Sequence, residues 1–232
     1  MINISNVKKR FGKVDVLNGL NLELASKGVI AILGPNGSGK TTLIKSVLGM
    51  VLPQSGTITF DGIDTKSQWS FRNKISYLPQ IARFPENITV TELFDLIVSI
   101  RSGSENRESL IELFGLTPFL NKKLGNLSGG TRQKVNIIIA FMFDSPVFIL
   151  DEPTAGLDPV SLIHLKELIQ KEKEKGKIII ITTHIMSLVE DIADEIVFLL
   201  EGEIYFRGSV LALKEETGES DLEHAIANIL RK

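Results

Sequence analysis

Residues 34–42 read GPNGSGKTT and follow directly on an apolar run at residues 29–33. The three glycines of this stretch can adopt backbone angles that are closed to other residues, so the loop can wrap around phosphate oxygens with its amides pointing inward. Lys40 supplies a positive charge to the β- and γ-phosphates of a nucleotide, and Thr41 offers a hydroxyl to Mg²⁺. A helix expected at residues 40–49 directs its positive end toward the same anion.

The alternative for this stretch is a plain glycine turn that joins a strand to a helix. The context that confirms a phosphate-binding loop is present, because a strand precedes it, a helix follows it and a Lys-Thr pair stands at the right place. We therefore expect a phosphate site built from the residues of the loop, namely Gly34, Pro35, Asn36, Gly37, Ser38, Gly39, Lys40, Thr41 and Thr42.

The composition of the chain limits its function. Its 232 residues suit one domain, or one core with an inserted lobe, and can bury a sizeable core. Lys and Arg total 26 against 28 Asp and Glu, and the pI near 6.0 gives no indication of a surface that binds nucleic acid. The absence of cysteine excludes disulfides and thiolate metal sites. No apolar run approaches the roughly 18 residues that a membrane helix needs, so action at a membrane would require a partner chain.

The first eighty residues contain mostly strand signals. We expect strands at residues 2–7, 20–25, 29–33, 57–60 and 75–78. The strand at 29–33 leads into the phosphate loop, and the others are expected to form an antiparallel flank beside the nucleotide.

Helical signals replace the strands between about residues 80 and 127. Thr89 and Glu92 have the spacing of a capping box. The helix that they open has an apolar stripe composed of Leu93, Leu96, Ile97 and Ile100. A second helix is expected at residues 105–114. This segment is therefore predicted to be a helical lobe inserted into a strand-rich core.

Apolar strands alternate with helices in the second half of the chain, which predicts a parallel sheet covered on both faces. The expected order is a helix at 130–143, a strand at 147–150, a helix at 158–176, a strand at 178–181, a helix at 186–192 and a strand pair at 195–200 and 203–207. Asp158 caps its helix, with Pro159 in the first turn. Ser220 and Glu223 form a second capping box, which opens a last helix with Leu222, Ile226, Ile229 and Leu230 on one side.

Two carboxylates follow the buried strand at 147–150. Asp151 at its end could hold Mg²⁺ beside Thr41 through a water shell. Glu152 could orient or deprotonate an attacking water. A lone Asp-Glu pair would more often be an acidic turn, but here a phosphate loop lies upstream in the same predicted sheet.

Residues 127–133 read LSGGTRQ and predict a second anion site. Ser128 is a hydroxyl donor at a helix cap, while Gly129 and Gly130 leave the backbone exposed at the start of the helix. The alternative is an ordinary capped helix. If the site is real, one domain carries two phosphate-binding surfaces for one γ-phosphate.

With these motifs the chain resembles the ATP-binding cassette ATPases, the nucleotide-binding subunits of ABC transporters. The resemblance rests on the phosphate loop, the Asp-Glu pair, AGLD at residues 155–158, LSGG and a histidine after the next strand, and it covers nearly the entire chain. LSGG discriminates between families, because a phosphate loop alone occurs in many NTPases and a kinase or GTPase gives no reason for LSGG.

The resemblance implies roles for four further residues. Gln80 matches a glutamine that contacts Mg²⁺ or water and joins the core to the helical lobe, and His184 matches a histidine that reaches the γ-phosphate. Phe11 stands where the family often has a tyrosine stacked on adenine. Asp158 matches an aspartate that bridges two subunits, besides capping its helix. Taken alone, Gln80 would be a surface residue, His184 a packing or surface residue and Phe11 a core aromatic.

The expected fold is α/β, with a P-loop NTPase core that has a mixed, mainly parallel sheet, an N-terminal antiparallel β flank and an inserted helical lobe. Residues 1–232 are expected to form a single ABC ATP-binding domain. Its core takes up about 1–79 and 145–208, its helical lobe about 80–144, and its C-terminal helices 209–232.

The implied activity is ATP hydrolysis with Mg²⁺ that drives transport. A homodimer, or a pair of ATPase subunits, closes head to tail so that LSGG of one copy covers ATP held by the other. Integral membrane permease subunits are the expected partners and nucleic acid is not, which places the chain at the cytoplasmic face of the cell membrane. The lobe residues Phe84, Pro85 and Glu86 are the expected permease contacts.

Other classes fit less well. A DNA-repair ATPase of this family would need a long coiled-coil insertion, and a translation factor would need two cassettes. A binding module without activity would be expected to lack Lys40, Glu152 or His184.

The transported substrate is less constrained. Residues 128–159 and 183–208 resemble the NosF-type subunits that help to mature the copper centre of nitrous oxide reductase. The alternative is the ATPase of a generic exporter of a drug, lipid or polysaccharide.

Overall fold

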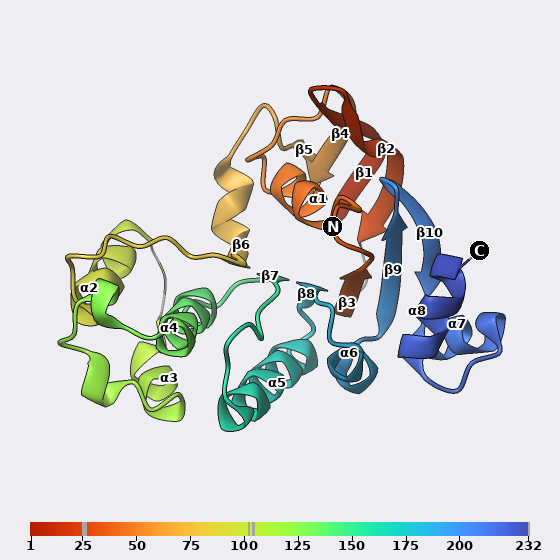
Figure 1. The fold of residues 1–232 in the computed structure, drawn as a ribbon. Helices are drawn as coiled ribbons and strands as arrows, with labels where there is room; N and C mark the ends of the chain where they lie inside the picture. Colours follow the sequence, from red (N-terminus) through yellow and green to blue (C-terminus); the bar gives the residue numbers. More distant parts are fainter. Residues whose placement is uncertain (25–26, 102, 104, 232) are drawn as a thin grey trace.

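A computed structural model describes residues 1–24, 27–101, 103 and 105–231 of the chain (Figure 1). Two residues of expected elements lie outside the described residues: Ala25, at the end of the second expected strand, and Lys232, at the end of the C-terminal helices. The described elements form two sheets and a set of helices, and the α/β fold with a mainly parallel sheet is confirmed.

The larger sheet has six strands, and all neighbouring pairs in it are parallel except β10 with β9. In spatial order the strands are β10 (Glu203–Gly208), β9 (Glu195–Leu200), β3 (Gly28–Leu33), β8 (Ile178–Thr182), β7 (Val147–Asp151) and β6 (Ile75–Leu78). The parallel strands end at one edge of the sheet, where ligands of such sheets bind.

The smaller sheet is antiparallel and corresponds to the expected N-terminal flank. In spatial order it contains β2 (Val14–Leu24), β1 (Ile2–Phe11), β4 (Ser55–Phe60) and β5 (Ile63–Asp64). Helix α1 (Lys40–Val47) lies beside it (Figure 1).

The remaining helices occupy the other side of the larger sheet and both of its ends. They are α2 (Val90–Ile100), α3 (Arg107–Leu113), α4 (Gly129–Phe141), α5 (Pro159–Glu174), α6 (Met186–Ile192), α7 (Val210–Thr217) and α8 (Leu222–Arg231), with short 3₁₀ turns at Ser70–Lys74, Thr117–Phe119 and Leu124–Asn126. In Figure 1, α2, α3 and α4 lie beyond the β6 end of the sheet, and α7 and α8 lie beside β9 and β10.

The larger sheet separates two apolar cores, because successive side chains of a strand point to opposite faces. In β3, Val29, Ala31 and Leu33 pack in the core that faces the helices, whereas Ile30 and Ile32 pack in the core shared with α1 and the antiparallel sheet. Both faces are covered, which explains why β3 is buried along its whole length and reads as a continuous apolar run.

Several predicted elements differ from the structure. The strand at 75–78 was expected in the antiparallel flank, but β6 pairs in parallel with β7 at the edge of the larger sheet. Its apolar residues alone cannot reveal which sheet they join. The hairpin of β1 and β2 is longer than predicted because polar residues alternate with buried ones along it. The short strand β5 and the helix α7 were not predicted as individual elements.

The capping box of Thr89 and Glu92 at the start of α2 is confirmed, with both reciprocal hydrogen bonds formed. The apolar stripe predicted for this helix was wrong in part, because Leu96 and Ile100 are 48% and 72% exposed. The buried face instead contains Val90, Leu93 and Phe94, because the helix is covered on one side only.

The cap predicted for the last helix was displaced by one residue. The side chain of Asp221, rather than that of Ser220, accepts a hydrogen bond from the backbone of His224 at 2.9 Å. Asp and Ser are both good caps, so the sequence offers two adjacent candidates. Leu230 is half exposed, and Ala225 takes its place on the buried face.

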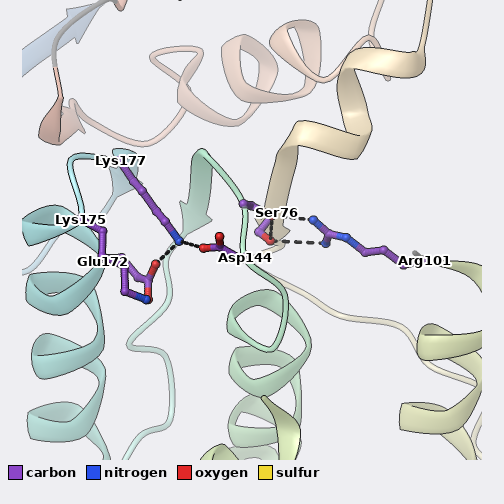
Figure 2. A network of polar contacts seen from close by, with 7 residues as sticks. Ser76, Arg101, Asp144, Glu172, Lys175 and Lys177 are labelled. Atoms are coloured by element: carbon purple, nitrogen blue, oxygen red, sulfur yellow. Dashed lines mark hydrogen bonds and ion pairs between the residues drawn. The ribbon is translucent and has the colours of Figure 1, made fainter. Parts of the chain in front are cut away.

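Polar side chains join the helical lobe to the sheet where β6 and β7 begin, at the opposite strand ends from the phosphate loop (Figure 2). Arg101, which follows α2, donates to the hydroxyl of Ser145 at 2.5 Å and lies 4.7 Å above the Phe143 ring. Ser145 also contacts Ser76 of β6 at 2.9 Å. Lys177 pairs with Asp144 in the same region. Burial lowers the pKa of Arg101.

The described part of the chain contains no helix that combines the length and apolar character needed to cross a membrane.

Candidate active site

The phosphate loop lies between β3 and α1, as predicted, and its conformation requires glycine at two points. Gly34 has φ 145°, and a Cβ atom there would lie 2.2 Å from the carbonyl oxygen of Leu199. Gly39 has φ 104°, and its Cβ would lie 2.7 Å from the carbonyl oxygen of Val16. A side chain at either position would displace neighbouring backbone, so the shape of the loop is fixed by these glycines.

Lys40 folds back over this loop. Its ammonium donates to the carbonyl oxygens of Gly34 at 2.7 Å and Pro35 at 3.0 Å. Burial lowers the pKa of Lys40, and the nearby charges of Glu152 and Asp151 oppose that shift. The ammonium is thus held at the loop with one of its three donors left for an anion.

A cleft of about 360 Å³ opens beside the loop. Its lining brings together segments that are far apart in the sequence: Val14, Val16, Asn36, Gly37, Gly39, Lys40, Thr41, Thr42, Gln80, Asp151 and Glu152. The topology explains this, since β3, β6 and β7 run in parallel and end at the same edge. The loop, Gln80 and the carboxylate pair each follow one of these strand ends.

Asp151 is the last residue of β7 and is only 2% exposed. One of its carboxylate oxygens accepts a hydrogen bond from the Thr182 hydroxyl at 2.5 Å. Its other oxygen, Oδ2, is buried and has no hydrogen-bond partner among the described residues. A buried carboxylate oxygen without a donor is costly, and a bound cation would satisfy it. The oxygen donors of Asp151 and Thr41 therefore fit Mg²⁺.

Glu152 adopts an unusual backbone conformation for a glutamate, with φ 49°. Its backbone amide donates to Thr182, both to the carbonyl oxygen at 3.0 Å and to the hydroxyl at 3.1 Å. Its side chain lies 2.9 Å from Nδ1 of His184, whose own side chain is 79% exposed. Such strained residues often occur at functional sites. Glu152 lines the cleft, and its carboxylate contacts His184 there.

The LSGG segment is found on another part of the molecule. Ser128 caps α4 and accepts a hydrogen bond from the Thr131 amide at 3.2 Å, while Gly129 is exposed beside it. A Cβ atom on Gly130 would lie 2.6 Å from the carbonyl oxygen of Gly156, so α4 approaches the segment after Glu152 closely. Ser128, Gly129 and Gly130 do not line the cleft beside the phosphate loop.

Two further candidate residues lie at the margins of the site. Phe11 ends β1 with half of its surface exposed, and the Lys9 ammonium lies 4.9 Å from its ring centroid, so it is available for stacking rather than part of the core. Asp158 caps α5 by accepting from the Ser161 amide at 2.9 Å and pairs with Lys134 of α4 at 2.8 Å. Lys134 and the Ser161 hydrogen bonds hold the pKa of Asp158 well below its usual range.

Sequence reasoning missed several residues of this region. Val14 and Val16 line the cleft, but the predicted strand began after them. Thr182 contacts both Asp151 and Glu152, and a polar residue at the end of an apolar strand could have identified it. Gln133 could not be assigned, because its contact with a distant loop depends on tertiary structure.

Comparison with known proteins decides the family. The model of the ABC transporter family matches residues 17–155, which include the phosphate loop, the LSGG segment and the Asp-Glu pair. The chain belongs to the ABC transporter family. A lantibiotic transport ATP-binding protein, SrtF of Streptococcus pyogenes, is 34% identical over 98% of this chain and 96% of its own length.

Two solved structures of ABC proteins are similar throughout. An ATP-binding subunit of an ABC transporter superposes with a TM-score of 0.91 at 26% identity and covers 99% of both chains. The ATP-binding cassette MJ0796, in a dimeric post-hydrolysis state bound to ADP and Pi, superposes with a TM-score of 0.80 at 26% identity, over 90% of this chain and 98% of the other. This ABC chain is therefore an ATPase, and its cofactors are ATP and Mg²⁺.

Proposed function

We propose that this ABC ATPase works as a head-to-tail pair of subunits that closes on ATP and drives membrane-spanning partner subunits. One observation carries the proposal: the cleft contains the phosphate loop and both carboxylates, whereas the LSGG helix end, a second anion-binding surface, lies outside it. The two surfaces can act on one nucleotide when they come from different copies. The dimeric state of the similar cassette MJ0796 supports this arrangement.

Residues in and beside the cleft have distinct roles in hydrolysis. The loop amides and Lys40 hold the β- and γ-phosphates. Thr41, Asp151 and Gln80 would hold Mg²⁺, which neutralises phosphate charge when bound. Glu152 orients the attacking water and accepts its proton, and His184 fixes the Glu152 carboxylate and reaches toward the γ-phosphate. Phe11 stacks on the base.

The LSGG surface of the partner copy completes the site. Ser128 and the backbone of Gly129 and Gly130 supply donors to the γ-phosphate from the end of α4. Asp158 lies near this region and contacts the partner subunit while it caps α5. Closure therefore depends on ATP held between the two copies, which links hydrolysis to movement.

The helical lobe, at about residues 80–144, is the surface that takes up this movement. A groove of about 490 Å³ is lined by Ile81, Ala82, Arg83, Phe84, Glu86, Leu124 and Arg132. It begins directly after Gln80, so a permease segment seated there would respond to the nucleotide. This partner places the chain at the cytoplasmic face of the cell membrane.

Export is the transport direction that we propose, since a relative from Rhizobium, 35% identical, is a Nod factor export ATP-binding protein. A generic exporter ATPase is the first candidate. Copper-site maturation of nitrous oxide reductase is the second, and it rests on the resemblance of residues 128–159 and 183–208 to NosF-type subunits. The genes beside this one would separate the two candidates. A permease gene alone would support the generic exporter. A permease gene together with a gene for a periplasmic copper-site protein would support copper-site maturation.

Mixing two inactive variants tests the head-to-tail arrangement. Lys40→Ala removes the positive charge that binds phosphate in the cleft. Ser128→Arg blocks the LSGG surface. Each variant alone should therefore be inactive. In an equal mixture, half of the dimers are mixed and each has one intact site, which should restore about a quarter of the wild-type ATPase activity. No recovery, with both variants folded and forming mixed dimers, would contradict the arrangement.

A further inference from the structure

Two amide side chains are buried in the middle of α4, the helix that begins at LSGG. Gln133 is 8% exposed and Asn136 is 2% exposed. Their spacing of three residues puts both on one face of the helix. Buried amides are costly unless they are hydrogen-bonded, so their partners indicate why they are present.

The partners of these amides lie beside the two candidate catalytic segments. Gln133 donates from Nε2 to the carbonyl oxygen of Pro153 at 2.8 Å, directly after Glu152. Asn136 donates from Nδ2 to the carbonyl oxygen of Pro79 at 3.1 Å, directly before Gln80. The two amides also approach each other, with 3.5 Å between Asn136 Nδ2 and Gln133 Oε1.

Two other contacts connect the first turns of α4 to the same segment. Gly130 approaches Gly156 so closely that a Cβ atom would not fit, and Lys134 pairs with Asp158 at 2.8 Å. With Gln133, the helix therefore contacts the chain between Pro153 and Asp158 at three successive points. The start of this helix and the turn that holds Glu152 move as one unit if these contacts persist.

We propose that Gln133 and Asn136 are positioning residues, which set Glu152 and Gln80 according to the position of the LSGG helix. This inference rests on the proposed function, since it requires Glu152 to act on water and LSGG to engage nucleotide in the second copy. When the partner's nucleotide draws the start of α4 toward it, the amides carry the displacement to Pro153 and Pro79. Hydrolysis then proceeds only in the closed pair.

A purely structural role for these amides makes a different prediction. Buried hydrogen bonds that only stabilise the fold would lower the melting temperature when removed, and turnover of the folded protein would stay the same. Positioning residues affect kcat, because small displacements of a reacting group have large effects on the rate. ATP affinity depends on the loop and Lys40, and it should not change.

The experiment measures ATPase kinetics of the full chain carrying Gln133→Met or Asn136→Leu, which keep the approximate volume and remove the donor. Either substitution should lower kcat by about 10- to 100-fold, with KM and the affinity for ATP unchanged. In a Glu152→Gln background, Gln133→Met should leave ATP-dependent dimerisation, measured by light scattering, intact.

Ser145→Ala is the matched control. Ser145 is 1% exposed and also bonds the helical lobe to the sheet, through Arg101, but it precedes β7, whereas Asp151 ends that strand. It should reduce the melting temperature to a similar extent and leave kcat at the wild-type value. If Gln133→Met does not fold, Asn136→Leu, which also removes an amide donor and places no charge in the core, carries the test.

The outcomes separate this inference from the proposed function. Wild-type kcat in folded Gln133→Met and Asn136→Leu, together with inactive Glu152→Gln, would overturn the positioning role alone. A loss that appears in KM instead of kcat would overturn it as well. Full activity of Glu152→Gln would contradict the proposed function itself, before the amides are considered.

Discussion

The phosphate loop and the LSGG segment both combine glycines with the start of a helix, yet the structure treats them differently. At the loop, Lys40 is half-buried and hydrogen-bonded to loop carbonyls, and a cleft with two carboxylates adjoins it. At LSGG, Ser128 caps α4 while Gly129 is exposed, and neither residue lines the cleft beside the phosphate loop. In the arrangement proposed above, the loop belongs to one half of the active site, whereas LSGG is the surface that meets a cleft on another molecule.

The largest expected effect falls on the cleft. Glu152→Gln should lower kcat by about 10²- to 10⁴-fold, because the amide cannot accept a proton from water. Binding of ATP should persist, since the loop and Lys40 are unchanged, so the variant should accumulate as an ATP-bound dimer. Single-turnover ATP hydrolysis and light scattering measure the two effects.

Glu201→Gln is the control for this change. Glu201 lies in the turn between β9 and β10 and has the same φ of 49° as Glu152, so it reproduces the backbone context of the substitution away from the cleft. It should not alter turnover. Wild-type hydrolysis by Glu152→Gln would exclude Glu152 as the base and leave the cleft as a binding site only.

A smaller effect is expected at LSGG. Ser128→Ala removes a donor to the partner's nucleotide and should lower kcat on the order of 10²-fold. It also removes a helix cap, which costs about 1 kcal/mol of stability. Because Ser128 lies outside the cleft of its own chain, ATP affinity measured on the monomer should stay unchanged.

The cap of another helix provides the matched control. Ser209 caps α7 by accepting from the Ala212 amide at 3.0 Å, and Ser209→Ala should reduce stability by a similar amount without reducing turnover. If both substitutions reduce kcat equally, the effect of Ser128→Ala comes from lost stability. If Ser128→Ala weakens nucleotide binding by the monomer, the division into two half-sites is wrong.

The same two regions show what a sequence can predict. The loop was predictable because its chemistry is local: consecutive residues supply the glycines, the lysine and the threonine. The strand ends that carry Asp151 and His184 followed from apolar runs in the second half of the chain. The fold class could therefore be derived before the structure was known.

Tertiary contacts were not predictable. Nothing in the sequence indicates that β6 joins the parallel sheet, because a strand of four residues with aliphatic side chains only at Ile75 and Leu78 fits either sheet. His184 was expected at the γ-phosphate, and only the structure adds its contact with Glu152. Gln133 and Asn136 resemble ordinary polar helix residues until their distant carbonyl partners are seen.

The smallest expected effect concerns the ion pair that joins the LSGG helix to the segment after Glu152. Lys134→Met removes the partner of Asp158 and should lower the melting temperature slightly at pH 7, since an ion pair with one half-exposed partner contributes little. The pKa of Asp158 is lowered in the folded state, so its ionised form stabilises the fold above the ordinary unfolded pKa of about 3.9. That contribution is lost as the pH falls through the lowered folded pKa.

The difference between Lys134→Met and the wild type should therefore stay constant from pH 7 to pH 5 and shrink in more acidic solution. Thermal unfolding across this range, down to the lowest pH at which both proteins unfold cooperatively, measures it. A difference that persists unchanged in acid would mean that Lys134 stabilises α4 through packing of its aliphatic stem rather than through its charge.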